Sequence, residues 1–236
     1  MHSDGEFCMA TSPLPEEVIP RALFGMTAVT GLVDAVSFLT LGHVFTANMT
    51  GNIILLAFAT VHVSGLSIAR SLTALLAFLL GAVLGGRVIA RASADSQIRF
   101  AAQAFLLEVA FLFAASLCCI GYGSDLVENS FQPFTLIALT ALAMGTRNAL
   151  VRKLAIPDLT TTVLTLTITG IGADSSLAKG NNPRLARRVE SIAAMFLGAA
   201  LGAVVIHYSI SAALLLATAI SAMCSAALFR SGRTPR

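Results

Sequence analysis

The stretch 71–86, SLTALLAFLLGAVLGG, contains no charged residue, and residues 189–229 contain none except Glu190. The hydrocarbon core of a bilayer, about 30 Å thick, is crossed by a helix of about 20 apolar residues. Over the 236 residues, 56% are hydrophobic and 11% are charged, whereas soluble domains average about 25% charged residues. Too little polar sequence remains to cover a soluble all-α protein. The composition therefore predicts an all-α polytopic membrane protein.

The two ends of the chain differ from this apolar body. Residues 1–20 are acidic and contain prolines, without the basic start and cleavage site of a signal peptide, and predict a cytoplasmic N-terminal tail. A single transmembrane domain is expected over 21–230, with a C-terminal tail at 231–236. The net charge of +3 comes from basic residues that flank apolar runs, which is typical of orientation signals and not of nucleic-acid binding. The four cysteines have no CxxC spacing, so no metal site and no cofactor are expected.

The apolar segments form two similar halves. Residues 77–86 match 194–203 at an offset of 117, and 31–35 match 145–149 at an offset of 114. Offsets that drift slightly while the order is kept indicate a duplicated unit, with repeat one at about 22–121 and repeat two at about 134–229. The apolar segments are 22–41, 44–63, 71–90, 100–121, 134–154, 158–173, 189–208 and 209–229.

The distribution of charge favours six full spans plus two broken or re-entrant segments over the alternative of eight full spans. If 44–63 and 158–173 enter and leave the membrane on one side, the halves are inverted, and only Arg70 of the flanking basic residues lies outside. Both termini are then cytoplasmic. With eight full spans, a cytoplasmic N-terminus would place several basic residues outside, against the positive-inside tendency: Arg87, Arg91, Arg99, Arg152 and Lys153.

These two segments are polar at every second position, a period that belongs to extended chain. Irregular backbone at membrane depth persists only where protein buries it or where it lines a cavity. Discontinuous segments at matching places of two halves indicate the central site of a transporter. The alternative is that the hydroxyl groups bond their own helices. The polar residues are Thr46, Asn48, Thr50 and Asn52 in the first half, and Thr161, Thr165, Thr167 and Thr169 in the second.

Three charged residues lie within apolar spans. Asp34 is in the first span, Glu108 is near the middle of the fourth segment, and Arg147 is in the fifth. An ionised group at mid-membrane costs about 2.5–3.5 kcal/mol, so it usually faces a partner or water. Asp34 corresponds to Asn148, which follows Arg147. We therefore expect Asp34 and the pair Arg147 and Asn148 to flank the polar segments, with a structural ion pair between the halves as the alternative.

The remaining motifs indicate packing. The pairs Gly81 and Gly85, and Gly198 and Gly202, are GxxxG spacings that let two helices approach closely. They predict packing of one half on the other or of two protomers, and the short chain is compatible with a homodimer. No Walker loop, HExxH or GxSxG sequence is present, so the chain is not expected to be an enzyme.

The stretch Gly31-Leu-Val-Asp34-Ala-Val-Ser-Phe38, followed by Val44-Phe45-Thr-Ala-Asn48-Met-Thr50-Gly51-Asn52, resembles the signature of the YoaK family of bacterial membrane proteins. Residues 143–149 followed by 161–165 resemble it in the second half, where the counterpart of Gly51 is absent. The resemblance covers about residues 20–230. It implies a multi-pass protein of the bacterial cytoplasmic (inner) membrane, and it implies no substrate, cofactor or catalytic residue.

The working hypothesis is a small secondary transporter or permease of two inverted three-span repeats, with membrane lipids and a small polar or anionic solute as partners. Asp34 would carry a coupling proton and Arg147 would bind an anionic group. The alternatives are a non-catalytic membrane assembly or sensor protein and, third, a lipid-acting membrane enzyme. The candidate substrate or ion site comprises Asp34, Asn48, Thr50, Asn52, Arg147, Asn148, Thr161, Thr165 and Thr167.

Overall fold

The computed structural model describes residues 18–91, 97–120, 131–154, 161 and 164–231. Within these ranges the chain forms helices and no strand, which confirms the predicted all-α class. The first helix begins at Val18, so the last three residues of the expected tail are helical, and the rest of both tails lies outside the described ranges. The helices are α1 (Val18–Thr40), α2 (Met49–Thr60), α3 (Ile68–Ala90), α4 (Gln97–Cys118), α5 (Gln132–Leu154), α6 (Thr165–Ala173), α7 (Leu185–Ile206) and α8 (Ile210–Ser231), with a 3-10 turn, η2 (Ser176–Ala178).

Helix length separates two classes. α1, α3, α4, α5, α7 and α8 have 22 or 23 residues, and at about 1.5 Å per residue they reach about 33–35 Å, enough to cross a bilayer. Five of them are also apolar enough over at least 18 residues, and α4 is apolar over the shorter stretch Ala102–Cys118. α2 has 12 residues and α6 has 9, so at about 18 and 14 Å they reach about halfway.

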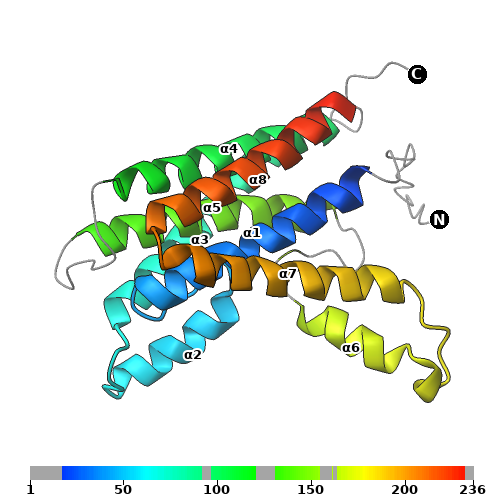
Figure 1. Ribbon diagram of the computed structural model, residues 1–236, viewed down its shortest axis with the longest axis horizontal. Helices are drawn as coiled ribbons and strands as arrows, with labels where there is room; N and C mark the ends of the chain where they lie inside the picture. The colour runs from blue at the N-terminus through cyan, green and yellow to red at the C-terminus, as the bar shows by residue number, and fades with distance from the viewer. Residues whose placement is uncertain (1–17, 92–96, 121–130, 155–160, 162–163, 232–236) are drawn as a thin grey trace, which may run out of the picture.

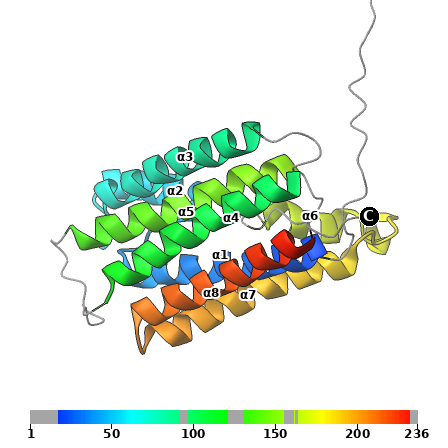
Figure 2. The ribbon, with the colours of Figure 1, turned by 90° about the horizontal axis from the view of Figure 1, so that it is seen from above.

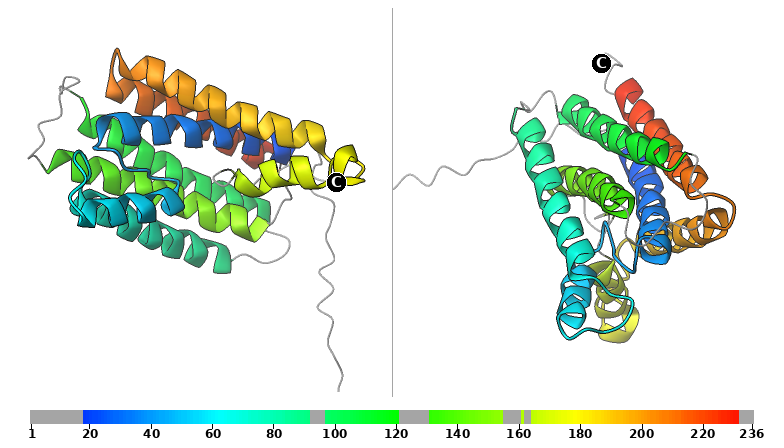
Figure 3. Two further views of the ribbon diagram at one scale, coloured as in Figure 1. Left: turned by 90° about the horizontal axis from the view of Figure 1, so that it is seen from below. Right: turned by 90° about the vertical axis from the view of Figure 1, so that its left-hand side faces the viewer.

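The six long helices lie side by side along the long axis of the molecule, and the two short helices lie together on one side of them (Figures 1 and 3). α2 begins near the middle of the bundle's length and runs back to the end at which α1 finishes. α6 also begins near the middle but runs to the opposite end, where α7 begins (Figure 1). Each short segment thus enters and leaves at one end of the bundle. This arrangement agrees with six full spans plus two re-entrant segments, and α2 and α6 are too short for the eight-span alternative.

The interpretation of the polar segments as extended chain is wrong in part. Gly42 and His43 have φ of 87° and 56°, and the chain from 41 to 48 is indeed non-helical before α2 begins. Thr165, Thr167 and Thr169, however, lie inside α6. Two residues advance an α-helix by about 200°, so over a few residues a helix also alternates. Thr167 is accordingly buried while Thr165 and Thr169 are exposed.

The inner and outer helices differ in their surroundings. α1 and α5 are mostly buried, whereas α3 and α7 are mostly exposed and turn leucines outward, such as Leu79 and Leu197. α1 packs against α7 and α8, α5 packs against α3 and α4, and α4 packs against α8, an arrangement visible from above in Figure 2. Helices of the first half therefore find their main partners in the second half. The outward leucines suit contact with lipid chains.

The four glycines of the GxxxG pairs lie at contacts between the halves. A Cβ atom on Gly85 would lie 2.5 Å from a carbonyl oxygen of the facing helix, and one on Gly202 would lie 3.0 Å away. Backbone cannot yield as the tip of a flexible side chain can, so these contacts require glycine. Each glycine faces the carbonyl group of one residue: Gly81 faces Leu142 and Gly85 faces Thr146 between α3 and α5, and Gly198 faces Ala28 and Gly202 faces Leu32 between α7 and α1.

Basic residues gather at one end of the bundle, the end at which α1 begins and α8 ends (Figure 1). Arg70, in the first turn of α3, lies at the other end. The basic residues at the first end are Arg21 in α1, Arg87 and Arg91 at the end of α3, Arg152 and Lys153 at the end of α5, Lys179, Arg184, Arg187 and Arg188 around the start of α7, and Arg230 in α8.

Candidate functional site

Asp34 anchors the first re-entrant segment to α1. Its carboxylate accepts hydrogen bonds from the backbone N–H of Thr46 at 3.1 Å and of Ala47 at 2.9 Å. The chain is not helical here, so these N–H groups have no partner within a helix, and at membrane depth water does not replace one. Asp34 supplies the acceptor. This predicted site residue therefore has a structural task, and its side chain is partly exposed.

Asn52 closes the same segment onto α2. Its Oδ1 accepts from the backbone N–H of Phe45 at 2.8 Å, and its Nδ2 donates to the Phe45 carbonyl oxygen. Asn48 caps α2, because its Oδ1 accepts from the N–H of Gly51 at 3.2 Å. The Phe45 ring stacks on Phe38 of α1 with a centroid distance of 4.9 Å. The predicted site residues Asn48 and Asn52 thus shape the segment, and Asn52 is fully buried.

The predicted threonines fall into three groups. Thr46 and Thr161 are fully buried, and neither hydroxyl group has a hydrogen-bond partner in the described part of the chain. Thr50 and Thr165, in the first turns of α2 and α6, are exposed. Thr167 is buried at 2% exposure. Buried polar groups in proteins nearly always have a partner, so the hydroxyl groups of Thr46 and Thr161 need an explanation.

The second re-entrant segment is described at Thr161 and from Leu164 onward. Thr161 has a φ of 55°, an unusual conformation for a β-branched residue, and Leu164 stands at the N-cap of α6 without a side-chain hydrogen bond to the helix. The far end of α6 is held by Arg188 of α7. The Arg188 guanidinium donates to the Gly170 carbonyl oxygen and lies 2.7 Å from the Asp174 carboxylate.

From the sequence, Arg188 belongs with Arg184 and Arg187 to a basic cluster that indicates orientation, and a buried role for it is not expected. In the structure Arg188 is only 4% exposed. Of the other members of the cluster, Arg184 is exposed and Arg187 is partly buried. A signal was present in the sequence. Arg188, Ser191, Gly198 and Gly202 lie on the buried side of α7, at spacings of three, seven and four residues, which repeat the period of a helix.

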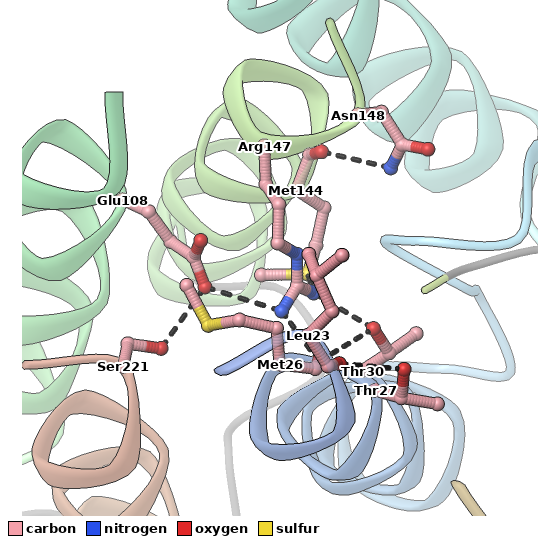
Figure 4. A network of polar contacts seen from close by, with 9 residues as sticks. All are labelled: Leu23, Met26, Thr27, Thr30, Glu108, Met144, Arg147, Asn148 and Ser221. Carbon is pink, nitrogen blue, oxygen red and sulfur yellow. Dashed lines mark hydrogen bonds and ion pairs between the residues drawn. The ribbon is translucent and has the colours of Figure 1, made fainter. Parts of the chain in front are cut away.

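Arg147 forms a second polar centre, in the interior of the long helices (Figure 4). Arg147 and Glu108 are both fully buried, and Nη1 of Arg147 lies 3.4 Å from Oε1 of Glu108. The guanidinium also donates to the Met26 carbonyl oxygen at 2.6 Å and to the Thr30 hydroxyl at 2.8 Å. Ser221 donates to Glu108 at 3.0 Å. The centre joins α1, α4, α5 and α8.

The structure separates the roles of Arg147 and Asp34. Arg147 makes its ion pair with Glu108, whereas the bonds of Asp34 go to backbone N–H groups. Asn148 leaves α5 on a different side from Arg147 (Figure 4) and donates to the Met144 carbonyl oxygen at 2.9 Å. The described residues contain no group of three or more His, Cys, Asp or Glu side chains that could hold a metal ion.

Comparison with known proteins places the chain in a family. It is 35% identical over 147 residues to UPF0700 transmembrane protein YoaK of Bacillus subtilis (strain 168), and the match spans 62% of each chain. No solved structure matches. Residues 22–227, nearly all of the helical body, match a family described as "Protein of unknown function (DUF1275)". With its membrane-spanning helices, the chain is an integral membrane protein, and it belongs to this uncharacterised family.

Proposed function

We propose that the chain is a small secondary transporter or permease built from two inverted repeats. The observation that carries the proposal is the pair of half-length helices, α2 and α6, which begin near mid-bundle and leave at opposite ends (Figure 1). In inverted-repeat transporters, such discontinuous segments form the substrate site at the repeat interface. Lipid-spanning proteins tolerate irregular backbone only where protein buries it or a cavity adjoins it.

Equivalent positions support the repeat. Gly31 of α1 faces the Met195 carbonyl oxygen of α7, and Gly145 of α5 faces the Phe78 carbonyl oxygen of α3. These glycines correspond at the offset of 114, and their partners correspond at 117. Thr46 and Thr161 correspond at 115, and both are buried with unpartnered hydroxyl groups. Two halves that run oppositely yet make the same contacts are expected after duplication.

The orientation follows from charge. The end that carries the basic residues would face the cytoplasm, because short loops rich in Lys and Arg stay inside. Both termini would then be cytoplasmic, in the inner membrane of a bacterium. Partners would be the membrane lipids around α3 and α7 and the transported solute. A homodimer would have to use surfaces other than the GxxxG pairs, which are occupied within the chain.

The test is transport by the purified full chain in liposomes, with a panel of small anions and metabolites, with and without a pH gradient. Uptake above empty liposomes is expected for at least one solute. Thr165→Trp, which fills the start of α6 from an exposed position, should block it. Leu177→Trp is the matched control, because Leu177 is 96% exposed in η2. The proposal would be refuted if no solute enters liposomes with the native chain faster than it enters empty liposomes. It would also be refuted if Thr165→Trp transports as well as the native chain and Leu177→Trp.

A non-catalytic assembly or sensor protein is the second candidate, and the buried pair of Arg147 and Glu108 favours it. That pair directs two membrane-embedded charges at each other. If all the polar groups are structural, Asp34→Asn should fold and leave the phenotype of the host strain intact. In a proton-coupled transporter the same substitution should abolish uptake driven by the pH gradient.

A further inference from the structure

We infer that Glu108 binds a proton, and that a proton on its carboxylate lets Arg147 move from Glu108 to Asp34 and so releases the first re-entrant segment. The inference rests on the proposed function and identifies its coupling ion as a proton. It starts from the polar centre in the interior of the long helices (Figure 4), where one guanidinium group lies near two carboxylates. The three groups belong to three helices, because Glu108 stands on α4, Arg147 on α5 and Asp34 on α1.

The pair of Glu108 and Arg147 is incompletely satisfied. Nη1 of Arg147 lies 3.4 Å from Oε1 of Glu108, whereas a strong charge-assisted hydrogen bond is about 2.7–2.9 Å long. Oε2 of Glu108 is fully buried and has no hydrogen-bond partner in the described part of the chain, and the same is true of Nε of Arg147. Burial makes an incompletely paired charge costly. A proton on Oε2 removes the charge of the carboxylate, and it needs no cavity of its own.

Asp34 is the second carboxylate within reach of Arg147. Nη2 of Arg147 donates to the Thr30 hydroxyl group at 2.8 Å, and Asp34 follows Thr30 by four residues on α1, so both side chains leave the helix on the same side. One helical turn rises about 5.4 Å, a distance that an arginine side chain can cover by changing its rotamers. The charges of Asp34 and Arg147 already act on each other. In this structure, however, Asp34 bonds to the N–H groups of Thr46 and Ala47.

Arg147 is the ionised group that acts most directly on Glu108. It reaches Glu108 from α5, and the Cys224 thiol of α8 also lies close enough to interact with the Glu108 charge. The other charged residues of the neighbouring helices stand near helix ends: Arg21 in α1, Arg70 and Arg87 in α3, Arg152 and Lys153 in α5, and Arg230 in α8. A change of charge at Glu108 is therefore felt first by Arg147.

The proposed step balances in atoms and in charge. A proton from water forms an O–H bond on the Glu108 carboxylate, and the centre of two carboxylates and one guanidinium group thereby loses its net negative charge. Arg147 keeps its charge, because a guanidinium group is not deprotonated in a protein, and Asp34 is the remaining carboxylate beside it. The N–H groups of Thr46 and Ala47 then lose their acceptor, and at membrane depth water does not replace it. The first re-entrant segment must therefore move, which links a proton inside the bundle to a segment of the proposed transport site.

Hydrogen exchange of the full chain in lipid nanodiscs, at one pH, tests the release of the segment. Glu108→Gln carries a neutral side chain permanently, so the amides of Thr46 and Ala47 should exchange about tenfold faster than in the native chain, the effect of about one lost hydrogen bond. Glu108→Leu with Arg147→Met lacks the guanidinium group that would take their acceptor, and the two amides should exchange at the native rate. Glu190→Gln, which removes an exposed acid on α7, is the matched control. The amides of α3, which lies outside the polar centre, report general loosening and should not change.

Infrared difference spectroscopy locates the proton itself. As the pH is lowered in steps over the range in which the native chain stays monodisperse, a carboxylic acid C=O band should grow at the high frequency of a carbonyl group in a dry interior. The band should persist in Glu190→Gln and be absent from Glu108→Leu with Arg147→Met. Since the double variant lacks both charges, it should keep its fold, and the band can be assigned even if Glu108→Gln alone does not fold.

The outcomes separate the two proposals. The inference would be overturned by exchange at the native rate in Glu108→Gln, by faster exchange that extends equally to α3, by equally fast exchange in the double variant, or by the lack of an infrared band that depends on Glu108. If liposomes still transport a solute in any of these cases, the proposed function stands without a proton at Glu108. If both measurements come out as expected but no solute is transported, the proton site stands and the proposed function fails.

Discussion

The pair of Glu108 and Arg147 should be most sensitive to removal of the carboxylate alone. Glu108→Gln leaves the Arg147 charge fully buried without a counter-charge, among neutral partners such as the Met26 carbonyl oxygen and the Thr30 hydroxyl group. Breaking a buried pair in this way costs about 3–5 kcal/mol. The converse change, Arg147→Met, should cost less, because a carboxyl group can take up a proton whereas a guanidinium cannot lose one in a protein. Replacement of both residues by apolar ones should recover most of the lost stability.

The assay heats purified protein and measures by size-exclusion chromatography how much of the monodisperse peak remains. The melting temperature is the temperature at which half of that peak is lost. For a chain of this size, 3 kcal/mol corresponds to about 10 °C, so Glu108→Gln should melt about 10 °C lower, and Glu108→Leu with Arg147→Met should lie within a few degrees of the native protein. Glu190→Gln is the control, because Glu190 is an exposed acid on α7. If Glu108→Gln melts like the control, or if the double variant is as unstable as Glu108→Gln, the pair does not stabilise the fold as argued.

The remaining predictions concern packing, the first re-entrant segment and topology. Gly198→Ala should lower the stability by about 1–3 kcal/mol, because its Cβ would meet backbone of α1. Gly86→Ala is the control, because no atom lies within 4 Å of the added Cβ, and it should not destabilise the protein. Equal melting points of the two variants would contradict this. Asp34→Asn keeps an acceptor for two N–H groups and should melt near the native value, whereas Asp34→Leu should cost about 2 kcal/mol or more, which the same melting assay measures. Single cysteines at Ser64 and Asn181, in a cysteine-free background, should react with an impermeant maleimide from opposite sides of the membrane; reaction from one side would refute the re-entrant topology.

Much of the architecture could be predicted from the sequence. In a membrane the architecture depends on the length of the apolar segments and on the need of every backbone N–H and C=O group for a hydrogen bond. Apolar runs of spanning length became the long helices, and the segments with Gly42, His43 and Thr161 at their turns became short ones. The glycine spacings located close helix contacts, although only the structure shows that these contacts lie within one chain. Helix α6 was misread as extended because two residues along a helix reverse the side that a side chain faces.

The pairing of the charges could not be predicted, since three membrane-embedded charges allow more than one ion pair. The sequence places Asp34 and the pair Arg147 and Asn148 at corresponding positions of the two halves, but the structure pairs Arg147 with Glu108. Asp34 does not pair with Arg147 because the non-helical N–H groups of residues 46 and 47 need a hydrogen-bond acceptor, which Asp34 supplies. The pattern of side chains in the sequence does not show that need. Arg188 was missed for a related reason, because its bond to the Gly170 carbonyl oxygen exists only after α6 and α7 have come together.

These contacts change what a polar residue in the membrane indicates about a site. Asp34, Asn52 and Arg188 bond first to backbone groups that the re-entrant segments would otherwise leave unsatisfied. A count of polar residues therefore overestimates a binding site, since a broken helix in lipid needs such groups even when nothing binds. The informative residues are those left over after the backbone is satisfied. By that criterion Asp34, Asn52 and Arg188 are weak site candidates. The buried atoms left without a hydrogen-bond partner in the described part of the chain are the better ones: the hydroxyl groups of Thr46, Thr161 and Ser191, Oε2 of Glu108 and Nε of Arg147.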